Sequence, residues 1–433
     1  MADILNHIKT ISDIIFQLRK EKNLTYAELE ELTGVGKPVL HKLEKGSTKR
    51  PEYKTVKAIT SAFPEIYQEL IECYITIENR TEVLYEVLQD VLSSEKPSLA
   101  SKVALRLLEN PSNETEDSLQ RLYYFTQEVS DSSLRLGLYN VIVKYSRKHG
   151  VMNYIAKGLL QKYLIERADL KRIDQSFQQG LEIAHYTNFL TNDENVIYHY
   201  RMALHAYAIK KYRECIEFAE NGMVLEKNES ELKARAHLSM INSYSALKNY
   251  DKVEELLDGF EKYKYDFVYE AAKHTRAIIK ARKGEYEIAV PLLEENLRLF
   301  SPRFRLHIVD ELFEIYLKVD NFDACSKLLE RENEIMNTCP VGPNVYRALA
   351  KYFRHKGYYQ VSIGLIDEGV KSFVTSVQYL KRINAFEEKD IYVFLLFIQN
   401  SIILNQGLYI YNFNEAYKNV VQKNLLLLNE GGK

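Results

Sequence analysis

Apolar residues recur three or four positions apart from the start of the chain, which is the spacing of one face of an amphipathic helix. The residues on this face are Ile4, Ile8, Ile11, Ile15 and Leu18. The pattern predicts a first helix that ends near Lys22.

A second and a third short helix follow this first one. Thr25 and Glu28 have the spacing of a capping box, which predicts that a helix begins after Thr25. Gly34 can adopt the positive φ of a tight turn, and a third helix is expected from about Lys37 to Lys45, ended by Gly46. Within this third helix, the side chains of Leu40 and Leu43 should pack against Leu29 and Leu32 of the second helix.

The third helix then presents its remaining side chains outward. Residues 1–62 carry eleven Lys and Arg against eight Asp and Glu, a net charge of +3, whereas the whole chain has −2. A basic end on an acidic chain suits nucleic-acid contact at that end. The expected DNA-contacting residues are Lys37, Val39, His41 and Lys42 toward base edges, and Lys45, Lys49, Arg50 and Lys54 toward phosphates.

A phrase mostly of the form Lys-x-aromatic-x-x-small, followed by apolar residues at helical spacing, recurs further along the chain. Its aromatic residues are Tyr212, Tyr250, Tyr286, Phe322 and Tyr358, separated by 38, 36, 36 and 36 residues, with Phe413 as a further copy. A fixed period of this length is typical of helical repeats. With only 17 Gly and 9 Pro, the chain is expected to be all-α, with domains at 1–64, 65–150 (connecting helices and degenerate first repeats) and 151–433.

The composition excludes several other classes of protein. No stretch of eighteen uncharged apolar residues occurs, so no membrane span is expected. The four cysteines show no CxxC spacing and no disulfide framework, which favours a reducing cytoplasm. Neither a phosphate-binding Gly-rich loop nor HExxH is present, and we expect no enzyme activity and no cofactor or metal.

The run LRKEKNLTYAELEELTGVGKPVLHKLEKGSTKRPEYKTVKAI resembles the phage-repressor (Xre) class of helix-turn-helix domains. The recurring phrase resembles the turn between the two helices of a tetratricopeptide repeat, with Cys215, Val253, Ala289, Cys325 and Val361 at the small packing position. The resemblance implies a right-handed superhelix with an inner groove that can hold an extended peptide.

Counting back from the small positions gives the residues expected in this groove. The expected peptide-binding residues are Tyr200, Tyr207, Arg235, Asn242, His274, Arg282, Asp310, Glu314, Tyr346 and Arg354, with Leu204, Ser245, Ile278, His307, Lys318 and Phe353 beside them.

The domain order resembles the RRNPP family of peptide-pheromone receptors, and most of all the arbitrium receptors (AimR) of phage lysis–lysogeny control, with NprR-like regulators as second choice. The resemblance implies a quorum-sensing transcription regulator, a homodimer that binds double-stranded operator DNA at paired half-sites and a short signalling peptide. Dimerisation is expected through Ile391–Ile410 and Asn424–Asn429. Two alternatives remain open: a Rap-like regulator that binds other proteins, and a repressor without a peptide ligand.

Overall fold

The computed structural model describes residues 9–333 and 342–383, and within them every regular element is a helix. The all-α fold class is therefore confirmed. The chain forms two compact units, residues 1–165 with 182–190 (unit 1) and residues 166–181 with 191–433 (unit 2). Unit 1 thus extends past residue 150 and contains most of α10.

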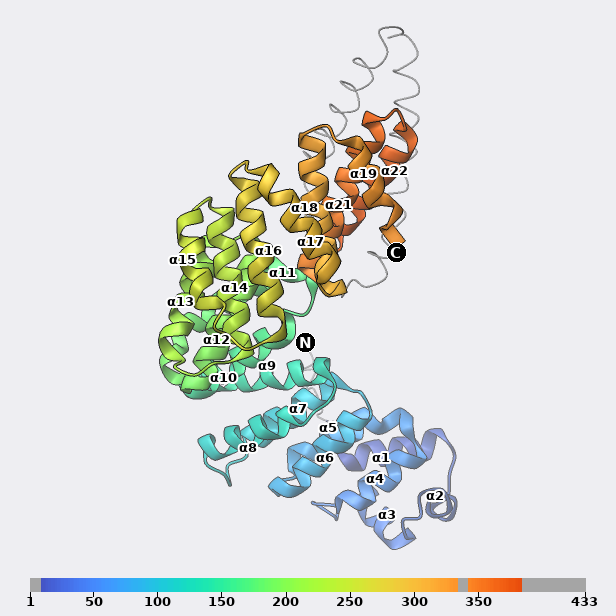
Figure 1. Cartoon of the computed structure of the whole chain (residues 1–433). Helices are drawn as coiled ribbons and strands as arrows, with labels where there is room; N and C mark the ends of the chain where they lie inside the picture. The colour runs from blue at the N-terminus through green and yellow to red at the C-terminus, as the bar shows by residue number, and fades with distance from the viewer. Residues whose placement is uncertain (1–8, 334–341, 384–433) are drawn as a thin grey trace, which may run out of the picture. The chain divides into compact units, whose positions relative to one another are not determined.

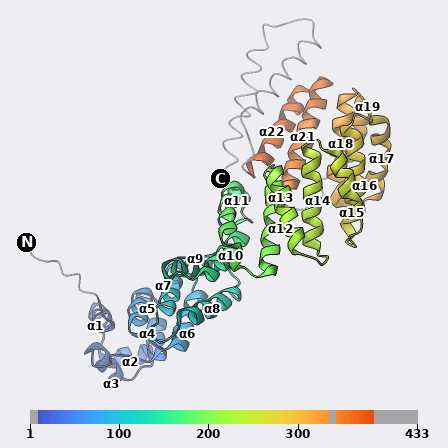
Figure 2. The same cartoon turned by 90° about the vertical axis from the view of Figure 1, so that its left-hand side faces the viewer.

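Figures 1 and 2 show the helices of both units in order along the chain. The helices of unit 1 are α1 (Ile11–Glu21), α2 (Tyr26–Thr33), α3 (Lys37–Glu44), α4 (Tyr53–Ala62), η1 (Pro64–Ile66), α5 (Tyr67–Ile77), α6 (Thr81–Ser93), α7 (Pro97–Leu108), α8 (Thr115–Gln127), α9 (Ser132–His149), α10 (Met152–Glu166) and η3 (Glu182–Phe189). Those of unit 2 are η2 (Leu170–Arg172), α11 (Ile173–Leu181), α12 (Asn192–Ala208), α13 (Tyr212–Leu225), α14 (Glu231–Ala246), α15 (Tyr250–Phe260), α16 (Asp266–Arg282), α17 (Tyr286–Leu299), α18 (Pro302–Lys318), α19 (Phe322–Glu330), α21 (Pro343–Ser362) and α22 (Ile366–Lys381).

The first four helices, which we call the head, form where the sequence predicts them. The side chain of Thr25 caps α2 and Glu28 returns the hydrogen bond, so the predicted capping box is present. Gly34 has φ 68°, in the left-handed region that lets the chain turn sharply between α2 and α3. Leu29, Leu40 and Leu43 are buried together, but Leu32 is exposed, so its predicted packing against α3 is wrong.

The head shares one hydrophobic core with the helices that follow it, and this core runs from Ile14 to Tyr154. Tyr53 of α4 stacks on Tyr74 of α5 with ring centroids 5.6 Å apart, and its hydroxyl donates to the carboxylate of Asp90 in α6 at 2.8 Å. Lys57 forms an ion pair with the same carboxylate at 2.7 Å. These contacts fix α4 to α5 and α6, so the head is an integral part of unit 1.

Unit 2 consists of successive helix pairs, and α12–α13, α14–α15, α16–α17 and α18–α19 follow one another in both views (Figures 1 and 2). A residue with positive φ lies two positions before the second helix of each pair, and these residues are Lys210, Lys248, Gly284, Asp320 and Gly364. The second helix then begins at the aromatic residue of the repeated phrase in the first four pairs, Tyr212, Tyr250, Tyr286 and Phe322. The predicted repeats are therefore correct for these four pairs.

The fifth pair has a different register from the one predicted. Tyr358 lies inside α21, and α22 begins eight residues later, at Ile366, after a turn at Gly364 with φ 89°. The small residue of this pair is therefore Gly369 and not Val361. A Cβ on Gly369 would lie 2.6 Å from Cγ2 of Val361 and 3.0 Å from the carbonyl oxygen of Gly357, so only glycine lets α22 approach α21 this closely.

Other predictions for the C-terminal part lie outside the described residues: the repeat copy at Phe413 and the dimerisation segments Ile391–Ile410 and Asn424–Asn429. Within the described ranges, every helix is too short or too polar to cross a membrane.

Candidate nucleic-acid interface and repeat groove

The outer face of α3 and the loop that follows it carry a group of exposed positive charges. Lys42, Lys45, Lys49, Arg50 and Lys54 are all exposed, and among the described residues no carboxylate forms an ion pair with any of them. Val39 is also exposed on α3. These residues are the ones predicted from the sequence, and their charges are available to an external polyanion.

Two of the predicted contact residues have partners within the head. The carboxylate of Glu30 accepts a hydrogen bond from the backbone N–H of Lys37 at 3.2 Å, and the Lys37 ammonium lies 4.0 Å from it. The ring of His41 contacts the edge of Tyr26, with centroids 5.5 Å apart, but the side chain stays exposed. Lys42 is thus the α3 lysine whose charge is least compensated.

Glu44 anchors α3 from its inner side, a role that the sequence reading did not assign. Its carboxylate accepts two hydrogen bonds from the guanidinium of Arg19, both at 2.7 Å, and the backbone carbonyl of Glu44 accepts one from Ser12 at 2.5 Å. The hydrogen bonds from Arg19 lower the pKa of Glu44. Arg19 also lies over the ring of Tyr26, at 4.6 Å from its centroid. The pair fixes α3 to α1 and α2.

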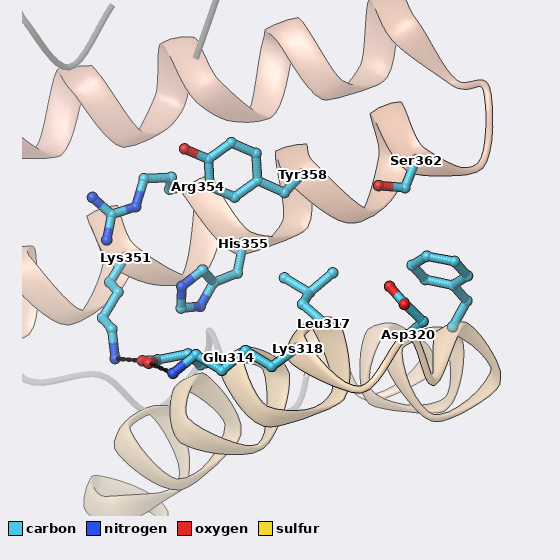
Figure 3. A pocket seen from close by; sticks show the side chains of 10 residues that line it. Glu314, Leu317, Lys318, Asp320, Lys351, Arg354, His355, Tyr358 and Ser362 are labelled. Atoms are coloured by element: carbon cyan, nitrogen blue, oxygen red, sulfur yellow. Dashed lines mark hydrogen bonds and ion pairs between the residues drawn. The ribbon is translucent and has the colours of Figure 1, made fainter. Parts of the chain in front are cut away.

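In unit 2, a pocket of about 460 Å³ lies between the facing sides of α18 and α21 (Figure 3). From α18, the turn after it and the start of α19 come Glu314, Leu317, Lys318, Asp320 and Phe322. From α21 come Lys351, Arg354, His355, Tyr358 and Ser362. The volume falls in the range of small-molecule binding sites.

Beside this pocket lies a network of charged side chains. They come from α16, α18 and α21, which are the first helices of three consecutive helix pairs. Arg282 pairs with Glu311 at 2.7 Å and with Glu314 at 3.2 Å. Lys351 reaches Asp310 at 3.0 Å, Glu311 at 3.2 Å and Glu314 at 2.9 Å. Burial alone would raise the pKa of Asp310, but Lys351 and His355 together outweigh it and the pKa is lowered. Burial disfavours the charged form of Lys351, but the three carboxylates favour it, and its pKa is raised.

The remaining predicted groove residues differ in how far they are buried. Tyr207 and Asn242 are half-buried, and none of the described residues forms a hydrogen bond with the amide of Asn242. Arg235 is exposed on α14, where it pairs with Glu231 at 2.6 Å and lies over the ring of Phe267. His274 is buried, and burial lowers its pKa to about 3.

Three predicted groove residues face elsewhere. Tyr200 is fully buried and packs against Gly222 of α13, because glycine leaves room for its ring, so its assignment to the groove is wrong. Tyr346 stacks on Tyr379 of α22 with centroids 6.0 Å apart, as Phe353 does at 5.8 Å. The assignments of Tyr346 and Phe353 follow from the eight-residue error in the fifth pair. Counted from Gly369, the same positions give Lys351, Arg354, Tyr358, Val361 and Ser362, and all but the buried Val361 line the pocket.

The comparisons with known proteins add a family for the head. Residues 15–65 match the family model described as helix-turn-helix. The head is a helix-turn-helix domain.

No curated protein matches the sequence. Among solved structures, the one described as "Structure of SeMet-phAimR" matches 94% of this chain and 99% of its own, with 13% sequence identity and a TM-score of 0.38. It bears the name of the receptor group that the sequence resembles, but both the identity and the TM-score are low.

Unit 2, which does not contain the helix-turn-helix domain, is expected to lose folding stability in acid because it contains buried histidines. Burial lowers the pKa values of His205 and His237 to about 4, against 6.5 for a free histidine. Below pH 6.5 the unfolded chain therefore binds protons that the folded chain does not, and stability falls by roughly 1.4 kcal/mol per histidine and pH unit until about pH 4. Thermal unfolding between pH 7.5 and 4.5 should show this loss.

His237 offers a matched variant for this measurement. Its ring contacts Phe260 and Tyr263, and both ring nitrogens are buried without a hydrogen-bond partner among the described residues. The variant His237→Phe should weaken the pH dependence of unfolding while it keeps the aromatic contacts. An unchanged pH dependence would show that His237 does not contribute to it.

Proposed function

We propose that this chain is a DNA-binding transcription regulator whose affinity for its operator is set by a short peptide bound in the groove of unit 2. The observation that carries the DNA-binding part is the set of exposed, uncompensated positive charges on α3 and the loop after it, within a helix-turn-helix domain. In such domains the recognition helix enters the major groove and flanking cations contact phosphates.

The peptide part of the proposal is supported by the pocket between α18 and α21. It combines charges of both signs with apolar and aromatic side chains, as an extended peptide requires. Two copies of the chain would present two recognition helices to paired half-sites. Arbitrium-type quorum sensing in control of phage lysogeny is the finer form of this proposal, and it comes from the sequence resemblance alone.

Lys42 and Lys49 should differ in their effect on DNA binding. An operator is first selected from random duplexes with the full chain. Lys42→Ala should then weaken binding to the selected operator by roughly 5- to 150-fold, because a contact to a base edge contributes about 1–3 kcal/mol, and should relax sequence preference. Lys49→Ala should weaken the operator and random duplexes alike and reduce the salt dependence. Fluorescence anisotropy at two salt concentrations measures both.

Lys148→Ala, an exposed lysine in the last turn of α9, is the control and should leave affinity unchanged. Equal operator affinity in the wild type and in Lys42→Ala would contradict the base-contact role. Failure of the full chain to select any duplex would contradict DNA binding itself and favour a regulator that binds proteins.

A further inference from the structure

The charges that line or adjoin the α18–α21 pocket are largely compensated within the protein. Three cations and three carboxylates form the network described above: Arg282, Lys318 and Lys351 with Asp310, Glu311 and Glu314. Lys318 lies 2.7 Å from Glu314. Nδ1 of His355 lies 3.2 Å from the carboxylate of Asp310. A ligand that competed for these groups would have to break ion pairs that already exist.

Two charged groups of the pocket lie outside this network. Arg354 lines the pocket from α21, and Asp320 lines it from the turn after α18. Among the described residues, neither the Arg354 guanidinium nor the Asp320 carboxylate has an ion-pair or hydrogen-bond partner. Their charges are therefore the ones that the protein leaves open to a ligand.

These two groups lie toward opposite ends of the pocket. Figure 3 shows Arg354 near Lys351, and Asp320 at the other end, across from Ser362, with Tyr358 and Leu317 between them. At a rise of about 1.5 Å per residue, Arg354 and Ser362 are roughly 12 Å apart along α21. An extended peptide covers this distance in about three or four residues.

We infer that this pocket selects a peptide segment with an acidic and a basic group about three residues apart and apolar residues between them, in which Arg354 binds the acid and Asp320 the base. A guanidinium can hold a carboxylate through two parallel hydrogen bonds, which gives it geometric selectivity. Tyr358, Leu317 and Phe322 offer the intervening apolar contact. The inference deepens the proposed function and rests on its peptide part.

Blocked synthetic hexapeptides test this inference on the full chain. The probes are Gly-Asp-X-X-Lys-Gly and its reversed order Gly-Lys-X-X-Asp-Gly, acetylated and amidated, in which X is an equimolar mixture of Phe, Leu and Tyr. Reference pools carry Asn for Asp, or Gln for Lys. Protein-bound peptides are separated by gel filtration and quantified by mass spectrometry. The wild type should retain at least one charged pool about tenfold or more above both of its reference pools.

Two conservative variants assign each preference to one side chain. Arg354→Gln should lose the preference for Asp over Asn and keep that for Lys over Gln, and Asp320→Asn should do the reverse. Asp320 has φ 52°, which asparagine also tolerates, so this variant keeps the turn. Arg298→Gln, an exposed arginine on α17, should change neither preference.

The outcomes separate the inference from the function on which it rests. Equal retention of charged and reference pools by the wild type would overturn the charge selectivity, while peptide binding would stand. Unaltered preferences in Arg354→Gln and Asp320→Asn would overturn the assignment to these residues. Retention of no peptide by a chain that still binds its selected operator would overturn both the inference and the peptide part of the proposed function.

Discussion

Glu44→Ala is expected to destabilise the helix-turn-helix domain by about 3 kcal/mol, the lower end of the cost of breaking a buried ion pair. The side chain of Glu44 is only 4% exposed, and that of Arg19 is 15% exposed, so the variant leaves a guanidinium with little solvent and without its carboxylate. Because α3 is fixed to α1 through this pair, operator affinity should also fall. Denaturant unfolding followed by circular dichroism, with anisotropy on the selected operator, measures the two effects.

Two further variants show that the effect comes from the pair. Glu31→Ala removes an exposed carboxylate of α2 and should cost little. Arg19→Met combined with Glu44→Leu removes both charges and should recover much of the stability, since apolar residues can replace a buried pair. If the double variant were less stable than Glu44→Ala, the pair would not be the cause of the loss.

The sequence predicted the helix-turn-helix domain well because its signals are local. A capping box, a glycine in the turn and the spacing of leucines each act within a few residues, and the exposed lysines of α3 follow from the helix period. The sequence did not predict the anchoring role of Glu44, because a glutamate near the end of a basic helix is ordinarily solvated. Its burial depends on Arg19, twenty-five residues earlier in the chain, and no local pattern reveals that contact.

The groove was predicted less well, and one turn explains most of the error. The sequence Lys356-Gly357-Tyr358 has the same kinds of residues as the true turn at Lys283-Gly284-Glu285-Tyr286, so the sequence alone predicts a turn there. In the structure the helix continues through Gly357, and Gly364 adopts the left-handed conformation. The signal that could have decided between them is Gly369, three residues after the first residue of α22, the spacing of Cys215 after Tyr212.

This shift in register decides which residues reach the pocket. Lys351, Tyr358 and Ser362 were missed, whereas Arg354 lines the pocket in spite of the error. The sequence also did not predict which of these charged side chains form ion pairs with one another. Arg282, Asp310 and Glu314 were expected to meet a peptide, but they meet one another and Lys351, since successive first helices lie close enough for ion pairs.

Lys351→Ala is expected to destabilise unit 2 by about 3–5 kcal/mol at pH 7. Lys351 is the one described cation that contacts Asp310, Glu311 and Glu314 together, and its removal leaves these three carboxylates close to one another. Their mutual repulsion and burial should raise their pKa values from the lowered values that Asp310 and Glu314 have beside Lys351. The stability difference should therefore be largest near neutral pH and shrink on acidification, as the carboxylates of the variant take up protons that those of the wild type do not.

A double-mutant cycle with Asp310→Asn isolates the pair at the centre of this network. Asp310 is 4% exposed, and its carboxylate lies 3.0 Å from the Lys351 ammonium. Asp310→Asn in the Lys351→Ala background should cost less than in the wild type, because the amide carries no charge that needs the lysine. Contacting charged residues typically show coupling energies of about 0.5–3 kcal/mol in such cycles. Additive effects of the two substitutions, or a Lys351→Ala penalty that does not change between pH 7.5 and 5, would contradict an electrostatic role for Lys351 and leave packing of its alkyl chain as the source of the loss.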